Sequence, residues 1–192
     1  MDDCYFILWQ DLLDKKGLLK AVNAGDFRAM STEIESISKE NTNLVASKVK
    51  MGAICQVGIV VKDLQKAVDN YWEKLGIGPW MTVRIEPPLL REVTLRGKPV
   101  ESSMLAAIAQ SGSIQLELIE PLEGPSIWKE FLEERGGGLH HVQSLDQDPK
   151  AALAAFREMG VDVLMSGRIG DNIFYYMDTE PILGTIYEFI GH

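Results

Sequence analysis

The sequence predicts an α+β protein in which two βαβββ modules form a curved mixed sheet around a metal cleft, with a helical extension before them. The first observation is a repeat, because residues 56–77 read as a strand followed by a helix and residues 141–161 read the same way. The second is that each copy closes on a strand that contains a glutamate, at 116–119 and 187–190. The third is that residues 1–50 have little of the glycine and proline punctuation that follows.

These observations divide the chain in two. We expect residues 1–50 to be a helical N-terminal extension that packs on the main unit or on a neighbouring subunit, with a lid over a functional site as the alternative. Residues 51–192 form the predicted domain, with modules at about 53–122 and 139–191. One copy alone is too small to bury both faces of its sheet, so the two modules should pair.

The first module begins with the β-branched run 54–61, which predicts a strand. Asp63 is a suitable N-cap for the following helix, whose apolar residues recur at spacings of three and four. That helix should end at Gly76, since glycine readily adopts the left-handed backbone of a helix end. Breaks at 87–88 and 96–99 separate short strands. These strands are expected at 81–84, 91–95, 103–110 and 113–119.

The second module repeats this order. Its helix is predicted over 149–159, with Pro149 in the first turn and Gly160 at the end. Strands are expected at 161–166, 172–177 and 184–190.

Composition excludes several classes of function. The net charge of −9 argues against nucleic acid or an anionic membrane as a partner, since both require clustered Lys and Arg. No apolar run approaches the roughly 20 residues needed to cross a bilayer. Cys4 and Cys55 are too few for a disulfide scaffold, so a cytoplasmic location is expected.

Four polar residues occupy equivalent places in the two copies, Gln56 opposite His141 and Glu117 opposite Glu188. Taken singly, a histidine or a strand glutamate is usually an ordinary core or surface residue. A buried ionised carboxylate is very costly without a partner, however, and both glutamates lie within apolar strands. If the modules pair about a pseudo-twofold axis, the four side chains converge, and a divalent cation would neutralise both carboxylates.

The chain resembles the vicinal oxygen chelate (glyoxalase, bleomycin resistance and dioxygenase) superfamily, and most of all its methylmalonyl-CoA epimerase branch. The likeness covers about residues 53–191 and rests on four motifs: Val-Gly-Ile-Val-Val-Lys-Asp-Leu at 57–64, Leu-Glu-Leu-Ile-Glu-Pro-Leu at 116–122, Phe-Leu-Glu at 131–133 and Gly-Gly-Gly-Leu-His-His-Val at 136–142.

The resemblance implies one divalent metal ion held by Gln56, Glu117, His141 and Glu188. Gln56 departs from the histidine usual in the epimerases, and the resulting set is similar to that of the zinc form of glyoxalase I. Zn, Mn, Co and Ni all suit such an oxygen-rich set, whereas an Fe(II) oxygenase would prefer two histidines and one carboxylate. Strand alternation predicts that His140 faces away from His141, where it would support that ligand or face the substrate.

The implied activity is the movement of a proton at the carbon next to a carbonyl of a small acid or thioester, as in an isomerase or epimerase. Glu188 is the first candidate for the base, and Glu86 and Glu92 are candidates for a second base on the opposite face. A glutathione substrate is disfavoured, because Val60 stands where the glutathione-binding relatives carry arginine. A CoA thioester would need basic groups for its phosphates, and the candidates, which could equally be solvated surface charges, are Arg84, Arg91, Arg96, Lys98 and Arg168.

Two other classes stay open. One is a metal-dependent lyase or dioxygenase of the same fold, and the other is a metal-free small-molecule binding protein of the resistance type. The four ligand-type residues argue against a pure binder, which has no need of buried carboxylates. A homodimer is also expected.

Overall fold

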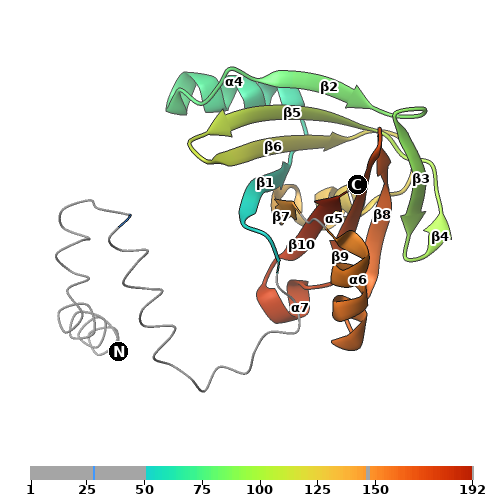
Figure 1. The fold of residues 1–192 in the computed structure, drawn as a ribbon. Helices are drawn as coiled ribbons and strands as arrows, with labels where there is room; N and C mark the ends of the chain where they lie inside the picture. Colours follow the sequence, from blue (N-terminus) through green and yellow to red (C-terminus); the bar gives the residue numbers. More distant parts are fainter. Residues whose placement is uncertain (1–27, 29–50, 146–147, 192) are drawn as a thin grey trace, which may run out of the picture. The chain divides into compact units, whose positions relative to one another are not determined.

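The computed structural model describes residues 28, 51–145 and 148–191 (Figure 1). Apart from Arg28, the predicted helical extension lies outside the described residues and stays a prediction. No helix within the described part of the chain is long and apolar enough to cross a membrane.

The first half of the domain contains one helix and six strands. The helix α4 begins after Asp63, whose carboxylate accepts a hydrogen bond from the Lys66 backbone N–H, and ends at Gly76 with φ 65°. Both ends agree with the prediction. The elements are β1 Ile54–Val60, α4 Leu64–Leu75, β2 Met81–Ile85, β3 Leu90–Leu95, β4 Lys98–Pro99, β5 Met104–Ser111 and β6 Ile114–Pro121.

The second half repeats the order of strand, helix and three strands. Asp148 caps α6 by accepting a hydrogen bond from the Ala151 backbone N–H at 3.0 Å, with Pro149 in the first turn as predicted. Two helices, α5 and α7, are additional to the predicted elements. The elements are α5 Ile127–Arg135, β7 Gly138–Leu145, α6 Pro149–Glu158, β8 Val163–Ile169, β9 Asn172–Met177, α7 Glu180–Leu183 and β10 Ile186–Gly191.

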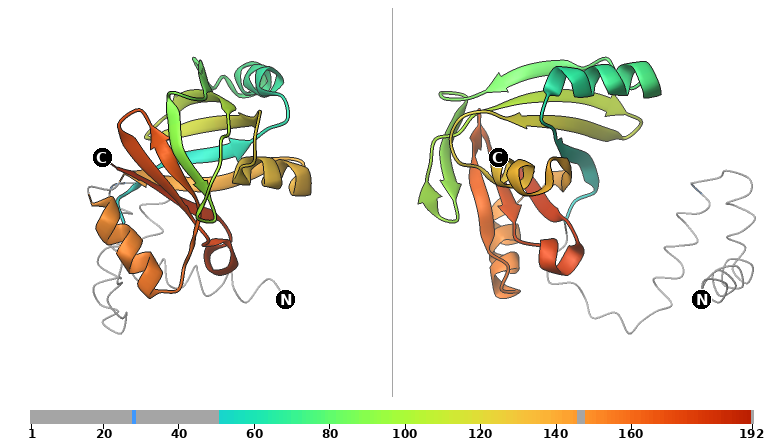
Figure 2. Two further views of the ribbon diagram at one scale, coloured as in Figure 1. Left: turned by 90° about the vertical axis from the view of Figure 1, so that its right-hand side faces the viewer. Right: turned by 180° about the vertical axis from the view of Figure 1, so that it is seen from behind.

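All ten strands form one mixed sheet in the order β2-β5-β6-β1-β7-β10-β9-β8-β3-β4, which confirms the predicted fold class. Each half contributes four strands in the same order outward from the centre, β1-β6-β5-β2 and β7-β10-β9-β8. The halves meet where β1 pairs antiparallel with β7, so the repeat has the pseudo-twofold relation expected of it. The sheet curls through this junction, as the views of Figure 2 show.

The β3–β4 hairpin departs from simple duplication. Its residues follow β2 in the chain, yet β3 pairs with β8 at the outer edge of the second half, with Arg91 opposite Arg168. The hairpin therefore ties the first half to the second and leaves β2, β5 and β6 as the three strands that complete the first βαβββ unit.

The two faces of the sheet bury different clusters. On the outer face α4 covers β5 and β6, where Leu64 packs with Ala107 and Leu118. On the inner face Val60 and Ile119 pack with Trp128 of α5 and Tyr176 of β9 in the largest core cluster. This apolar packing fills one end of the inner face, and the neighbouring polar residues lie beside it.

Candidate functional site

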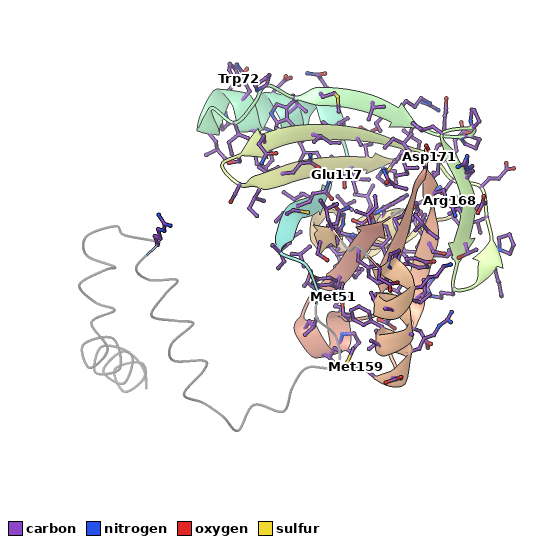
Figure 3. The ribbon with its side chains drawn as sticks, in the orientation of Figure 1. Met51, Trp72, Glu117, Met159, Arg168 and Asp171 are labelled. Atoms are coloured by element: carbon purple, nitrogen blue, oxygen red, sulfur yellow. The ribbon has the colours of Figure 1, made fainter. Side chains whose placement is uncertain are left out.

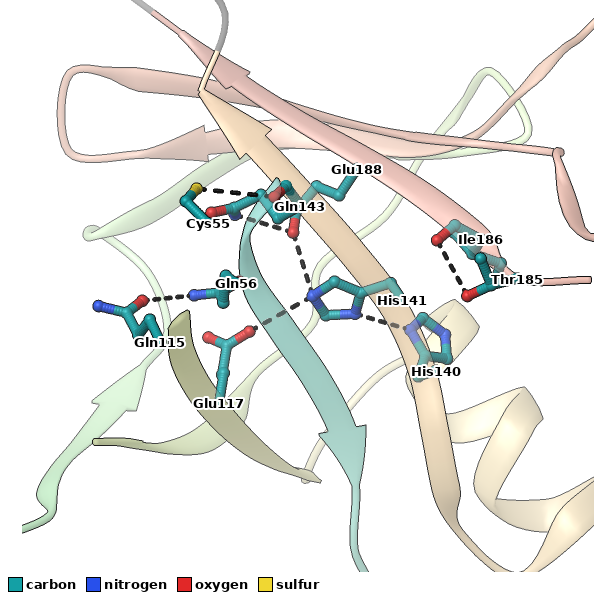
Figure 4. A network of polar contacts seen from close by, with 10 residues as sticks. All are labelled: Cys55, Gln56, Gln115, Glu117, His140, His141, Gln143, Thr185, Ile186 and Glu188. Atoms are coloured by element: carbon teal, nitrogen blue, oxygen red, sulfur yellow. Dashed lines mark hydrogen bonds and ion pairs between the residues drawn. The ribbon is translucent and has the colours of Figure 1, made fainter. Parts of the chain in front are cut away.

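The inner face carries two adjacent rows of side chains that cross the junction between the halves. One row consists of cross-strand neighbours on β6, β1, β7, β10 and β9, namely Gln115, Gln56, Gln143, Glu188 and Tyr176. The next row consists of Glu117, Gly58, His141 and Ile186. Most of these residues are polar and buried, which is rare in a protein interior and marks the region as a candidate site (Figure 4).

The four predicted ligands lie within these rows, and we call Gln56, Glu117, His141 and Glu188 the four-residue cluster. Register makes them two related pairs. Gln56 lies opposite Gln143 and Gly58 opposite His141, so the pseudo-twofold axis exchanges Gln56 with His141. The same operation exchanges Glu117 with Glu188. Glu117 lies two residues beyond Gln115, the β6 neighbour of Gln56, and Glu188 lies two residues beyond Ile186, the β10 neighbour of His141.

Three members of the cluster contact one another directly. The Nε2 atom of His141 lies 3.1 Å from Glu188 Oε2 and 3.6 Å from Glu117 Oε2. Gln56 is 5% exposed, and its Oε1 atom has no hydrogen-bond partner among the described residues. The free lone pairs of this amide oxygen, together with an imidazole nitrogen that lies close to two carboxylates, are groups that can bind a cation.

The donor set fits a divalent cation. Metal bonds of about 2.1 Å place neighbouring ligand atoms roughly 3.0–3.5 Å apart, and the separations between His141 and the two carboxylates fall near that range. Within residues 51–145 and 148–191, no three His, Cys, Asp or Glu side chains are already arranged as a metal site. Both carboxylates lie against the imidazole Nε2 itself, so a cation would have to take the place of the Nε2 proton and recruit the amide of Gln56.

Burial and mutual contact shift the protonation of this cluster. Desolvation, with a smaller contribution from the charge of Glu188, raises the pKa of Glu117 from 4.5 to about 7 against the opposing effect of His141. For His141, desolvation acts to lower the pKa, but the hydrogen bond to Glu188 and the charges of both glutamates together raise the pKa above 6.5. Without a metal, Glu117 and His141 therefore hold their protons to higher pH than the same groups in water.

Tyr176 and Gln143 complete the surroundings of Glu188. The Gln143 side-chain amide donates a hydrogen bond to Glu188 Oε2 at 2.9 Å. Burial, then the charges of Glu188 and Glu117 and hydrogen bonding to Glu188, raise the pKa of the Tyr176 hydroxyl well above 10. Tyr176 therefore stays protonated and available to donate to the carboxylate.

The position of His140 differs from the prediction. Strict alternation would turn it away from His141, but the register shifts between the Gly58 and Ile59 pairs of β1 and β7, and both histidines are buried. The two Nδ1 atoms lie 3.0 Å apart, and the His140 ring packs edge-on against Phe131. Burial and the neighbouring His141 lower the pKa of His140 well below 6.5, so it supports His141 as a neutral ring.

Glu86 and Glu92, the candidates for a second base, lie outside the four-residue cluster. The Glu86 carboxylate pairs with Arg84 at 2.6 Å. The Glu92 side chain, which is 68% exposed, pairs at 3.2 Å with Arg168, which lies near the end of β8 (Figure 3). In the part of the chain that the structure describes, no hydrogen bond or ion pair links either carboxylate to the cluster. Their catalytic role stays a prediction.

Three residues of the rows were missed by sequence reasoning. Gln115 and Gln143 had a readable signal, because each lies two positions from a candidate ligand on the same strand and therefore shares its face. The sequence carried no such signal for Tyr176, since this residue reaches Glu188 through the pairing of β9 with β10.

Gly58 is the residue that makes room for the imidazole. A Cβ atom at this position would overlap Cε1, Nε2 and Nδ1 of His141. We expect Gly58→Ala to displace the ring, destabilise the fold by about 1–3 kcal/mol and weaken divalent-metal binding. Urea unfolding and metal titration check this expectation. Gly112→Ala is the comparison for metal affinity: its Cβ position is open, so metal binding should be unchanged, although its φ of 61° makes any side chain there costly for stability. Unchanged metal affinity in Gly58→Ala would contradict it.

Comparison with known proteins identifies the family of the chain. Residues 55–176 match the model of the Glyoxalase/Bleomycin resistance protein/Dioxygenase superfamily. The uncharacterized protein YqjC of Bacillus subtilis (strain 168) is 31% identical over 114 residues, which cover 59% of this chain and 71% of that protein.

Solved structures share the fold. A hypothetical protein, BH1468 from Bacillus halodurans C-125, superposes with a TM-score of 0.52 at 20% identity, over 74% of this chain and 96% of that one. Methylmalonyl-CoA epimerase from Mycobacterium tuberculosis gives 0.52 at 22% identity, over 77% and 91%. A variant of the Streptomyces coelicolor epimerase in complex with 2-nitronate-propionyl-CoA gives 0.52 at 24% identity, over 74% and 95%. With a family model that spans most of the two halves and a paired-module sheet of the same fold, the chain belongs to the Glyoxalase/Bleomycin resistance protein/Dioxygenase superfamily.

Proposed function

We propose that this protein is a metal-dependent isomerase or epimerase that moves a proton at the carbon next to a carbonyl of a small acid or thioester. The observation that carries the proposal is the buried contact of His141 Nε2 with two carboxylates, beside the Gln56 amide oxygen, for which residues 51–145 and 148–191 supply no hydrogen-bond partner. A small-molecule binder would gain nothing from desolvating two carboxylates, because their burial is costly unless they serve as ligands or bases.

Gln56, Glu117, His141 and Glu188 would hold one divalent ion, with Zn, Mn, Co and Ni as candidates. When bound, such an ion supplies a positive charge that stabilises an enolate oxygen. The protein's own groups have the remaining tasks. The apolar wall formed by Val60, Ile119 and Trp128 keeps water from one side of the cluster and strengthens its electrostatic interactions.

Glu188 is the proposed base that accepts the proton from the substrate carbon. Its Oε2 atom accepts the hydrogen bond from Gln143, and the buried hydroxyl of Tyr176 lies beside it, so the carboxylate is held in one orientation. Return of the proton to the opposite face would require a second group, and Glu86 and Glu92 are proposed for that role.

A CoA thioester is the proposed substrate class. The Streptomyces coelicolor epimerase of the same fold was solved with 2-nitronate-propionyl-CoA. Of the five basic residues considered for CoA phosphates, Arg84, Arg91, Arg96 and Arg168 are paired with acidic side chains, whereas Lys98 is exposed on β4. A homodimer is also part of the proposal, and light scattering of the purified protein tests it.

Two measurements test the function. Metal analysis of protein purified without chelator should give about one equivalent of divalent ion, and His141→Ala should lose it. Solvent deuterium should then enter the α-carbon of candidate thioesters or 2-oxo compounds in the presence of the loaded protein. A metal content below about half an equivalent that is unchanged in His141→Ala would favour the binding-protein reading, and bound metal without any exchange would favour a lyase or dioxygenase.

A further inference from the structure

Gln115 contacts a candidate ligand without belonging to the four-residue cluster. Its Oε1 atom accepts a hydrogen bond of 2.6 Å from the Gln56 side-chain amide, across the parallel pairing of β6 and β1 (Figure 4). The Gln56 nitrogen is engaged by Gln115, so the other end of the amide, Oε1, is the atom left buried without a hydrogen-bond partner in the part of the chain that the structure describes.

An amide ligand needs such a partner to select which of its two ends faces the cation. The two ends of a glutamine amide have nearly the same shape, but only the oxygen has a lone pair to offer a cation. A side chain that accepts a hydrogen bond from the nitrogen therefore decides which end faces the cluster. The two halves differ at this point. The pseudo-twofold counterpart of Gln115 is Ile186, the β10 neighbour of His141, and His141 is contacted by His140 instead.

We propose that Gln115 is a positioning residue that turns the carbonyl oxygen of Gln56 toward the four-residue cluster and thereby completes an oxygen-rich site for a divalent cation. This rests on the metal dependence of the proposed function. Gln115 acts through Gln56 and does not touch the cation.

The test compares Gln115→Met, which keeps the length of the side chain but loses the acceptor, with Gln115→Glu, which keeps an acceptor oxygen. Zn²⁺ affinity is measured by competition with a chromogenic chelator, and the coordination of bound Co²⁺ by its visible absorption. We expect Gln115→Met to bind Zn²⁺ about 10–100-fold more weakly and to change the Co²⁺ spectrum, as loss of a hydrogen bond to a ligand generally does. Gln115→Glu should bind at least as tightly as the wild type.

Gln110→Met is the matched control, because exposed Gln110 pairs with Gln115 in the β5–β6 register but its side-chain amide donates to the Gly112 carbonyl instead of a cluster residue. It should leave Zn²⁺ affinity unchanged. Metal-free Gln115→Met loses one hydrogen bond and should unfold at a modestly lower temperature, but it should stay folded under the conditions of the Zn²⁺ titration, which separates a positioning role from a structural one.

A double-mutant cycle with Gln56→Glu isolates the interaction. The two oxygens of a carboxylate are equivalent, so it no longer matters which end of the side chain at position 56 faces the cluster, and Gln115→Met should weaken Zn²⁺ binding far less in that background. Wild-type affinity in the single Gln115→Met variant, or an equal loss in both backgrounds, would overturn the inference and leave the proposed function intact. Failure of the wild type itself to bind Zn²⁺ or Co²⁺ would overturn both.

Discussion

Glu188→Gln is expected to lower the rate of deuterium exchange at the substrate α-carbon by about 10²–10⁴-fold, the usual contribution of a positioned general base. Glu188 is 4% exposed and contacts His141 Nε2 and the amide of Gln143 through one oxygen. Glutamine has the same shape but cannot accept the proton, so the loss should appear mainly in kcat, with a smaller loss of metal affinity from the missing charge.

The measurement is the initial rate of exchange at saturating metal, followed by mass spectrometry or NMR. Glu158→Gln is the control, since Glu158 is an exposed glutamate at the end of α6 and should retain full activity. Metal-loaded Glu188→Gln that exchanges within a few-fold of the wild type would show that another group is the base, and Glu86 and Glu92 would be the next residues to replace.

The repeated parts of the fold are those that the sequence predicts well. Asp63, Gly76 and Pro149 each mark the start or end of a helix through residues only a few positions away, so these signals can be recognised without tertiary information. Duplication supplies what local signals cannot, because it relates Gln56 to His141 and Glu117 to Glu188, and the register of the central strands gives the same relation.

The remaining features depend on contacts between distant segments. The chain around Glu92 reads as one more strand of the first module, yet it pairs with β8, 76 residues away at the contact with Arg168. The burial of His140 depends on a register shift between β1 and β7, which no pattern within β7 reveals. The approach of Tyr176 to Glu188 likewise requires the β9–β10 pairing. Periodicity within a strand defines its faces, but only tertiary pairing decides which faces meet.

We expect the metal-free protein to lose stability as pH rises from about 5 to 8. Below pH 4.5 Glu117 is protonated in both the folded and the unfolded chain. Between 4.5 and about 7 the unfolded chain releases this proton while the folded chain retains it, so the free energy of unfolding falls. The raised pKa implies a loss on the order of 3 kcal/mol across that window. His141 acts in the same direction, because its pKa is also raised and its contribution is lost as pH rises above 6.5.

A divalent cation should reverse this trend, since it replaces the protons of Glu117 and His141 and binds more tightly as they leave. Stabilisation by Zn²⁺ should therefore be larger at pH 8 than at pH 6, reaching about 4 kcal/mol at a free concentration 1,000 times Kd. Urea unfolding from pH 5 to 8, with and without metal, measures both effects. Glu117→Gln is the matched variant, because it carries no titrating carboxyl: metal-free, it should be more stable than the wild type at pH 8, and it should gain little from Zn²⁺. If the metal-free wild type instead became more stable than Glu117→Gln as pH rises, the carboxylate of Glu117 would be compensated by something other than a cation.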